Sequence, residues 1–101
     1  MIAYNVTVKV DLEINNIWVE WMKKDHIPKV LETGCFTGYK FFRIVEEDQT
    51  DGITYAVQYY ANSMSDYFEY KEKFAPALQK ETRDIFPDKF VAHRTILREV
   101  E

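Results

Sequence analysis

The chain has 101 residues, enough for one domain with one hydrophobic core and no stabilising cross-links. Its 47% apolar and 30% charged content excludes a disordered chain, and a net charge of -4 without any cluster of Lys or Arg argues against nucleic acid or an anionic membrane surface as partner. Cys35 is the only cysteine, so the chain forms no internal disulfide and no cysteine-rich zinc site, which is typical of a reducing compartment.

Residues 2–10 alternate strictly between two faces, which predicts a half-buried strand at the start of the chain. The first residues contain neither a basic segment nor a long apolar stretch. We therefore expect no signal peptide, no membrane span and a cytoplasmic protein.

Apolar residues recur at helical spacing over residues 14–31, and Gly34 marks the end of this predicted helix. Pro28 has no N–H to donate and disfavours helical geometry in the residue before it. The sequence therefore predicts a kink or break near His26.

Residues 35–46 and 53–61 predict the second and third strands. The acidic, polar stretch between them ends in the pair Asp51-Gly52, which is typical of a hairpin loop.

Ser63, with Asp66 three residues later, predicts the start of a second helix, which Pro76 should kink. Residues 89–98 predict a fourth strand. This order predicts one α+β domain over residues 1–101, a ferredoxin-like βαββαβ fold. Its four-stranded antiparallel sheet should have the order 4-1-3-2, with two helices on one face.

The edge strands are apolar on both sides, as Phe41 with Phe42 and Val91 with Phe90 illustrate. A monomer would expose these side chains on the sheet face that the helices leave uncovered. We therefore expect a homodimer in which a second copy covers this open face.

His26 follows Trp18 by eight positions and Met22 by four, so it projects near the apolar stripe of the first helix. It is our candidate catalytic residue, a general acid or base, and burial should lower its pKa below about 6.5. The alternative is a structural histidine that bonds a carbonyl freed at the kink. His26 and His93 lie on separate elements and no cofactor motif is present, so we expect neither a metal nor a cofactor.

Asn5, Gln58 and Tyr60 are candidate ligand-binding residues on the open face. Covered by a partner subunit, they would place a few donors and acceptors inside a mostly apolar cavity, as in small-molecule sites. The alternative is a solvated sheet face. Trp21 lies three positions after Trp18, a spacing typical of core packing, with ligand stacking as the alternative role.

Four segments carry a resemblance to known proteins: Tyr4-Asn5-Val6-Thr7, His26-Ile27-Pro28, Thr33-Gly34-Cys35-Phe36 and Phe74-Ala75-Pro76-Ala77-Leu78. With the predicted element order, the chain resembles the dimeric α/β-barrel superfamily. That superfamily includes antibiotic-biosynthesis-type monooxygenases, ethyl tert-butyl ether-degradation-type proteins and rhamnose mutarotases. More closely, the chain resembles a bacterial domain family of unknown function.

The resemblance implies two sheets, one from each subunit, that meet in a barrel with a cavity in each half. Rhamnose mutarotases carry a functional histidine in a region similar to residues 21–28, which implies a role for His26. Haem-degrading members use an asparagine on the first strand, which Asn5 matches. They also use a tryptophan where this chain has Tyr60 and a histidine on the second helix, where it has none, so haem degradation is not implied.

Two functions follow as hypotheses. In the first, the protein is a cofactor-free enzyme with His26 as proton shuttle, while Asn5, Gln58 and Tyr60 orient a small organic substrate in the barrel cavity. In the alternative, it is a non-catalytic module that binds a small molecule or another protein.

Overall fold

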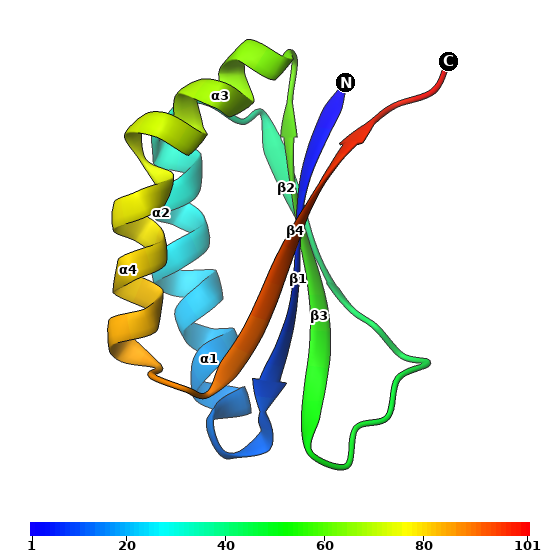
Figure 1. The fold of residues 1–101 in the computed structure, drawn as a ribbon, viewed down its shortest axis with the longest axis vertical. Helices are drawn as coiled ribbons and strands as arrows, with labels where there is room; N and C mark the ends of the chain where they lie inside the picture. The colour runs from blue at the N-terminus through cyan, green and yellow to red at the C-terminus, as the bar shows by residue number, and fades with distance from the viewer.

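The computed structural model describes residues 1–101 and contains one antiparallel sheet with helices on one face (Figure 1). The strands are β1 (Ile2–Asp11), β2 (Gly38–Arg43), β3 (Gly52–Ala61) and β4 (Phe90–Arg98). The helices are α1 (Asn15–Trp21), α2 (Ile27–Glu32), α3 (Met64–Lys73) and α4 (Ala75–Ile85). The sheet order β2-β3-β1-β4 is the predicted order read from the other edge, so the predicted ferredoxin-like fold is confirmed.

The first helical segment is irregular where Pro28 predicts it. A 3-10 turn η1 (Leu12–Ile14) precedes α1, and a π-helical turn η2 (Met22–His26) joins α1 to α2. In this wider turn the N–H of Ile27 donates to the carbonyl of Met22, five residues back. Pro28 lies in the first turn of α2, where its missing N–H is tolerated. The helix therefore continues past the proline with His26 in the irregular turn.

The second helical segment begins and bends as predicted. Ser63 caps α3, since its hydroxyl accepts from the backbone N–H of Asp66 at 3.4 Å. Phe74 leaves the helical conformation with φ -120°, and Pro76 lies in the first turn of α4. Figure 1 shows the change of direction between α3, which lies at one end of the sheet, and α4, which runs along it.

The second strand is shorter than the predicted range of residues 35–46. β2 contains only Gly38–Arg43, because Cys35 and Phe36 turn into the core before the strand begins. The ring of Phe36 packs against Tyr59 at 5.5 Å and edge-on against Tyr70 at 4.9 Å. Burial of this ring between sheet and helix therefore replaces strand pairing at residues 35–36.

The two faces of the sheet follow the predicted alternation. The helices cover the face that carries the core side chains of β1 and β3, which are Ile2, Tyr4, Val8, Val10, Ile53, Tyr55, Val57, Tyr59 and Ala61. The strands pair so that Asn5 lies opposite Gln58 and Ala3 opposite Tyr60 on the other face. That second face, which we call the open face, has no helix over it (Figure 1).

Candidate functional site

A cavity of about 240 Å³ lies between the sheet and the helices, and we call it the helix–sheet cavity. Its apolar lining residues are Val6, Val8, Trp18, Met22, Val57, Phe90 and Ala92, and its polar ones are Tyr4, His26, Tyr59, Tyr70, Gln79, Thr82, Arg83 and Arg94. An apolar cavity of about 150 Å³ accepts benzene, whereas drug-sized ligands need roughly 300 Å³ or more. The helix–sheet cavity therefore suits a molecule somewhat larger than benzene.

Small side chains on the strands leave room for this cavity. Val8 on β1 lies opposite Ala92 on β4, and both line the cavity floor. The opposite wall comes from Trp18 and Met22 on the first helical segment and Gln79 on α4. Arg83 and Arg94 line the cavity and are exposed to solvent, so they mark its open end.

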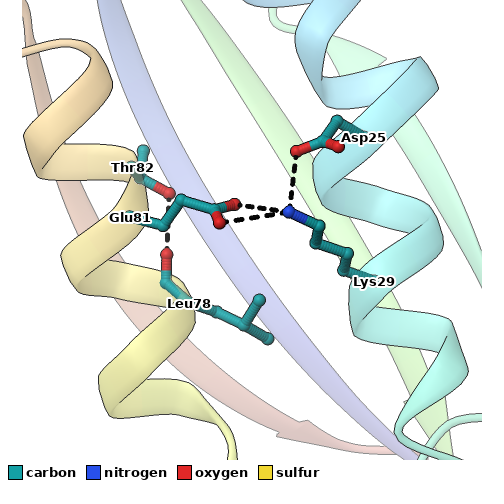
Figure 2. A network of polar contacts seen from close by, with 5 residues as sticks. All are labelled: Asp25, Lys29, Leu78, Glu81 and Thr82. Carbon is teal, nitrogen blue, oxygen red and sulfur yellow. Dashed lines mark hydrogen bonds and ion pairs between the residues drawn. The ribbon is translucent and has the colours of Figure 1, made fainter.

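An ion-pair network holds the two helical walls together. The ammonium of Lys29 on α2 lies 3.1 Å from both carboxylate oxygens of Glu81 on α4 and 3.2 Å from Asp25 (Figure 2). The hydrogen bond to Glu81 is the main reason why the pKa of Lys29 is raised. These side chains are partly exposed, so solvent screens the pairs and each contributes little to stability. The network therefore links α2, which follows His26 in the chain, to α4.

His26 points into the cavity from the π-helical turn. Its ring stacks on Trp21, with centroids 5.0 Å apart, and Trp21 packs edge-on against Phe86 at 5.3 Å. The Nδ1 atom of His26 is buried and has no hydrogen-bond partner. Burial lowers the pKa of His26 to about 4, against smaller opposing effects of the Glu81 and Asp25 carboxylates. The imidazole is therefore neutral at pH 7, and the predicted direction of the shift is confirmed.

Three tyrosines supply further polar groups to the cavity. Burial raises the pKa of Tyr4, Tyr59 and Tyr70, so all three phenols are neutral at pH 7. The hydroxyl of Tyr4 accepts a hydrogen bond from Nε of Arg94 at 3.1 Å. The hydroxyl of Tyr59 is buried without a partner. Because unpaired buried polar groups are rare, Tyr59 and His26 mark places where a bound molecule would complete the hydrogen bonding.

The structure separates the predicted site residues into two places. Asn5, Gln58 and Tyr60 lie on the open face, where Asn5 donates to Thr7 at 3.0 Å and Tyr60 donates to Gln58 at 2.9 Å. His26 lies on the other side of the sheet, because successive strand residues point to opposite faces. The hypothesis of one cavity holding all four residues is therefore corrected, while a ligand role for the open-face residues stays a prediction.

Trp21 also lies outside the cavity lining, where it supports the ring of His26. Sequence reasoning missed Tyr4, Tyr59, Gln79 and Arg94 as site residues. One signal for Arg94 was present: it continues the inward-facing series Phe90, Ala92 on the last strand, where a charged residue is unusual.

No group of three or more His, Cys, Asp or Glu side chains lies close enough together to hold a metal ion. None of the helices has the length and apolar character needed to cross a membrane. The thiol of Cys35 is buried and free. The backbone N–H of this residue donates to the hydroxyl of Thr33 at 3.3 Å.

The buried histidine predicts a loss of stability in acid. The pKa of His26 is about 4 in the folded protein against an ordinary 6.5, so between these values the unfolded chain binds a proton that the folded protein does not. The free energy of unfolding is therefore highest above pH 6.5, and it is lower by about 3 kcal/mol at pH 4. Urea unfolding of wild type and His26→Gln across this range measures the difference, and other acid-sensitive groups cancel between them. An imidazole that titrates near pH 6.5 by NMR would contradict the prediction.

Together, the sheet order and the helices on one face define a ferredoxin-like α+β domain. The chain belongs to the DUF4286 family, described as a domain of unknown function, whose model matches residues 1–100. The predicted resemblance to a family of unknown function is thereby confirmed.

Solved structures share the fold at low sequence identity. An EthD family protein from Bacillus halodurans is 16% identical with a TM-score of 0.67, over 99% of this chain and 100% of that one. An antibiotic biosynthesis monooxygenase is 10% identical with a TM-score of 0.67, over 100% of both chains. A dimeric ferredoxin-like protein from an uncultured marine organism is 11% identical with a TM-score of 0.67, over 100% of this chain and 96% of that one. No curated protein matches the chain.

Proposed function

We propose that this protein is an enzyme that transfers a proton on a small, largely apolar organic molecule bound in the helix–sheet cavity. The observation that carries the proposal is His26, which lines a cavity large enough for such a molecule and whose buried Nδ1 has no hydrogen-bond partner. A neutral histidine in an apolar site can accept a proton at pH 7 without first losing one.

The chemistry needs only side chains of the chain itself. Nδ1 of His26 takes a proton from a carbon or oxygen of the substrate, and the electron pair of the broken bond stays on the substrate as an enolate or phenolate. The hydroxyl of Tyr59, also unpartnered, donates a hydrogen bond to the oxygen that gains the negative charge. Return of the proton at another atom completes an isomerisation.

The low pKa of His26 limits the substrate class. A base with a pKa of about 4 is weak, so the proton that it removes must already be acidic. Carbons next to a ketone and a second activating group, such as a carboxyl or an aromatic ring, meet this condition. The same weakness supports a second candidate, a non-catalytic binding protein in which His26 and Tyr59 only hydrogen-bond the ligand.

We also propose that the protein is a cytoplasmic homodimer whose two sheets meet through their open faces. Phe42, Val91 and Leu97 expose apolar surface on this face, which a second copy would cover. The same contact would enclose Asn5, Gln58 and Tyr60 between the sheets. An interface of this kind should bury more than about 2,000 Å² in total. The single buried free cysteine agrees with a reducing compartment.

Deuterium exchange tests the proposed enzyme. Methyl phenylpyruvate, a neutral ketone with an acidic methylene, is incubated with the protein in D₂O and its exchange is followed by proton NMR. We expect the wild-type protein to accelerate exchange, with the rate falling as the pH drops towards 4, where His26 becomes protonated. His26→Gln should abolish the acceleration, whereas the control Lys23→Gln, an exposed residue of the same π-helical turn, should retain it.

Isothermal titration of the same ester, beside the exchange measurement, separates the two candidates. Binding without acceleration would reject the enzyme and support the non-catalytic binding protein. Equal acceleration by wild type and His26→Gln would remove His26 from the mechanism. Absence of binding by phenylpyruvate and by its methyl ester would reject the helix–sheet cavity as a site for molecules of this size.

A further inference from the structure

The charge of the helix–sheet cavity is opposite to that of the whole protein. The chain has 17 acidic and 13 basic residues, yet the cavity lining contains two arginines, Arg83 and Arg94, and no aspartate or glutamate. With His26 neutral, the lining carries a positive charge. A local field of this sign attracts anions to a site on an otherwise acidic protein.

Neither arginine is neutralised by the protein. The ion pairs of the chain all use lysines or the N-terminus as the cation. Glu81 on α4 is held by Lys29 on α2 (Figure 2), and Asp84 is held by Lys80 at 2.7 Å. The carboxylates closest in sequence to Arg83 are therefore already paired with lysines.

Arg94 is held in place for a ligand by a neutral group. Its Nε donates to the hydroxyl of Tyr4 at 3.1 Å, and the ring of Tyr4 is fixed by Tyr67 at 5.3 Å and Tyr70 at 5.5 Å. A guanidinium has five N–H donors, of which this contact uses one. Its planar fork matches the two oxygens of a carboxylate, and a fixed side chain loses little entropy when it binds one.

We infer that the ligand of the helix–sheet cavity is a small organic carboxylic acid, with its apolar body in the cavity and its carboxylate on Arg94 at the open end. This inference rests on the proposed function and names its substrate class. The valine, tryptophan and methionine lining accepts the apolar body, which lies next to His26. Arg83, which also lines the cavity and is exposed to solvent, adds a second positive charge.

A matched pair of compounds tests the inference. Phenylpyruvate and its methyl ester have the same ring and ketone but differ in charge, and isothermal titration gives the Kd of each. We expect wild type to bind the acid at least about tenfold more tightly than the ester, in keeping with one charge-assisted contact. Arg94→Met, which keeps the aliphatic stem, should remove this preference and change the Kd of the ester by no more than about twofold.

Two further variants test the proposed contact between Arg94 and the carboxylate. Arg98→Met removes an arginine from the same strand that does not line the cavity, so both Kd values should stay unchanged. Tyr4→Phe keeps the ring but removes the acceptor that holds Arg94, so the preference for the acid should fall to an intermediate value. A lower thermal stability alone would not move the ratio of the two Kd values.

The outcomes distinguish a failure of this inference from a failure of the proposed function on which it rests. If the ester binds as tightly as the acid, or if Arg94→Met keeps the preference, the carboxylate inference is overturned and the proposed cavity function stands. If neither compound binds at millimolar concentration, both are overturned. A preference for the acid that falls with rising salt and disappears in Arg94→Met supports the inference.

Discussion

Replacing Trp18 with alanine is expected to lower the free energy of unfolding by about 3–5 kcal/mol. Trp18 is only 2% exposed, and its ring lies 5.0 Å from Tyr55 and 5.8 Å from Phe41, so it joins α1 to two strands of the sheet. Its loss would also enlarge the adjacent helix–sheet cavity. Urea unfolding at a fixed protein concentration measures the effect, and the melting temperature should fall by more than about 10 °C.

Ile17 provides a control on the same helix. Its side chain is 67% exposed, so Ile17→Ala should change the free energy of unfolding by no more than about 0.5 kcal/mol. Similar losses at Trp18 and Ile17 would contradict the assigned packing of α1 against the sheet.

Charges on the open face are expected to separate the dimer without unfolding the subunits. Val91 and Leu97 on β4 are 75% and 41% exposed in the single chain, so aspartate at both positions is tolerated in a monomer. In a dimer through the open faces, the same carboxylates would be buried without partners, which is strongly unfavourable. The double variant Val91→Asp, Leu97→Asp should therefore raise the dimer Kd by at least about 1,000-fold.

Sedimentation equilibrium measures this directly. Wild type at micromolar concentration should have twice the 12.1 kDa mass of the chain, and the double variant should have the mass of one chain. The control variant Ile17→Asp, Ile85→Asp places the same charges on exposed positions of the helices and should remain dimeric. A wild-type mass of 12.1 kDa would reject the proposed dimer.

Much of the fold could be predicted from local patterns because they report local geometry. Strict alternation assigned the faces of β1 and β3, and the spacing of proline located the irregular turn at Met22–His26. The same patterns failed at residues 35–36, because an aromatic residue such as Phe36 suits a strand and a helix–sheet core equally well. Only its contacts with Tyr59 and Tyr70 distinguish the two.

Part of the candidate site could also be predicted from local patterns. The spacing of His26 to Trp18 and Pro28 was enough to predict that it lies on the inward side of an interrupted helix and that burial lowers its pKa. The sequence also predicted that Asn5 and Gln58 share the other face of the sheet.

The position of the cavity and the charged groups around it could not be predicted from the sequence and follow from the packing of the whole chain. A cavity depends on the summed volumes of side chains from several elements, such as Ala92 on β4 and Gln79 on α4, and no single segment carries that information. Arg83 likewise stays unpaired while its neighbour Glu81 pairs with Lys29, 52 residues away from Glu81 in the chain. These long-range contacts are what place a positive cavity in an acidic protein.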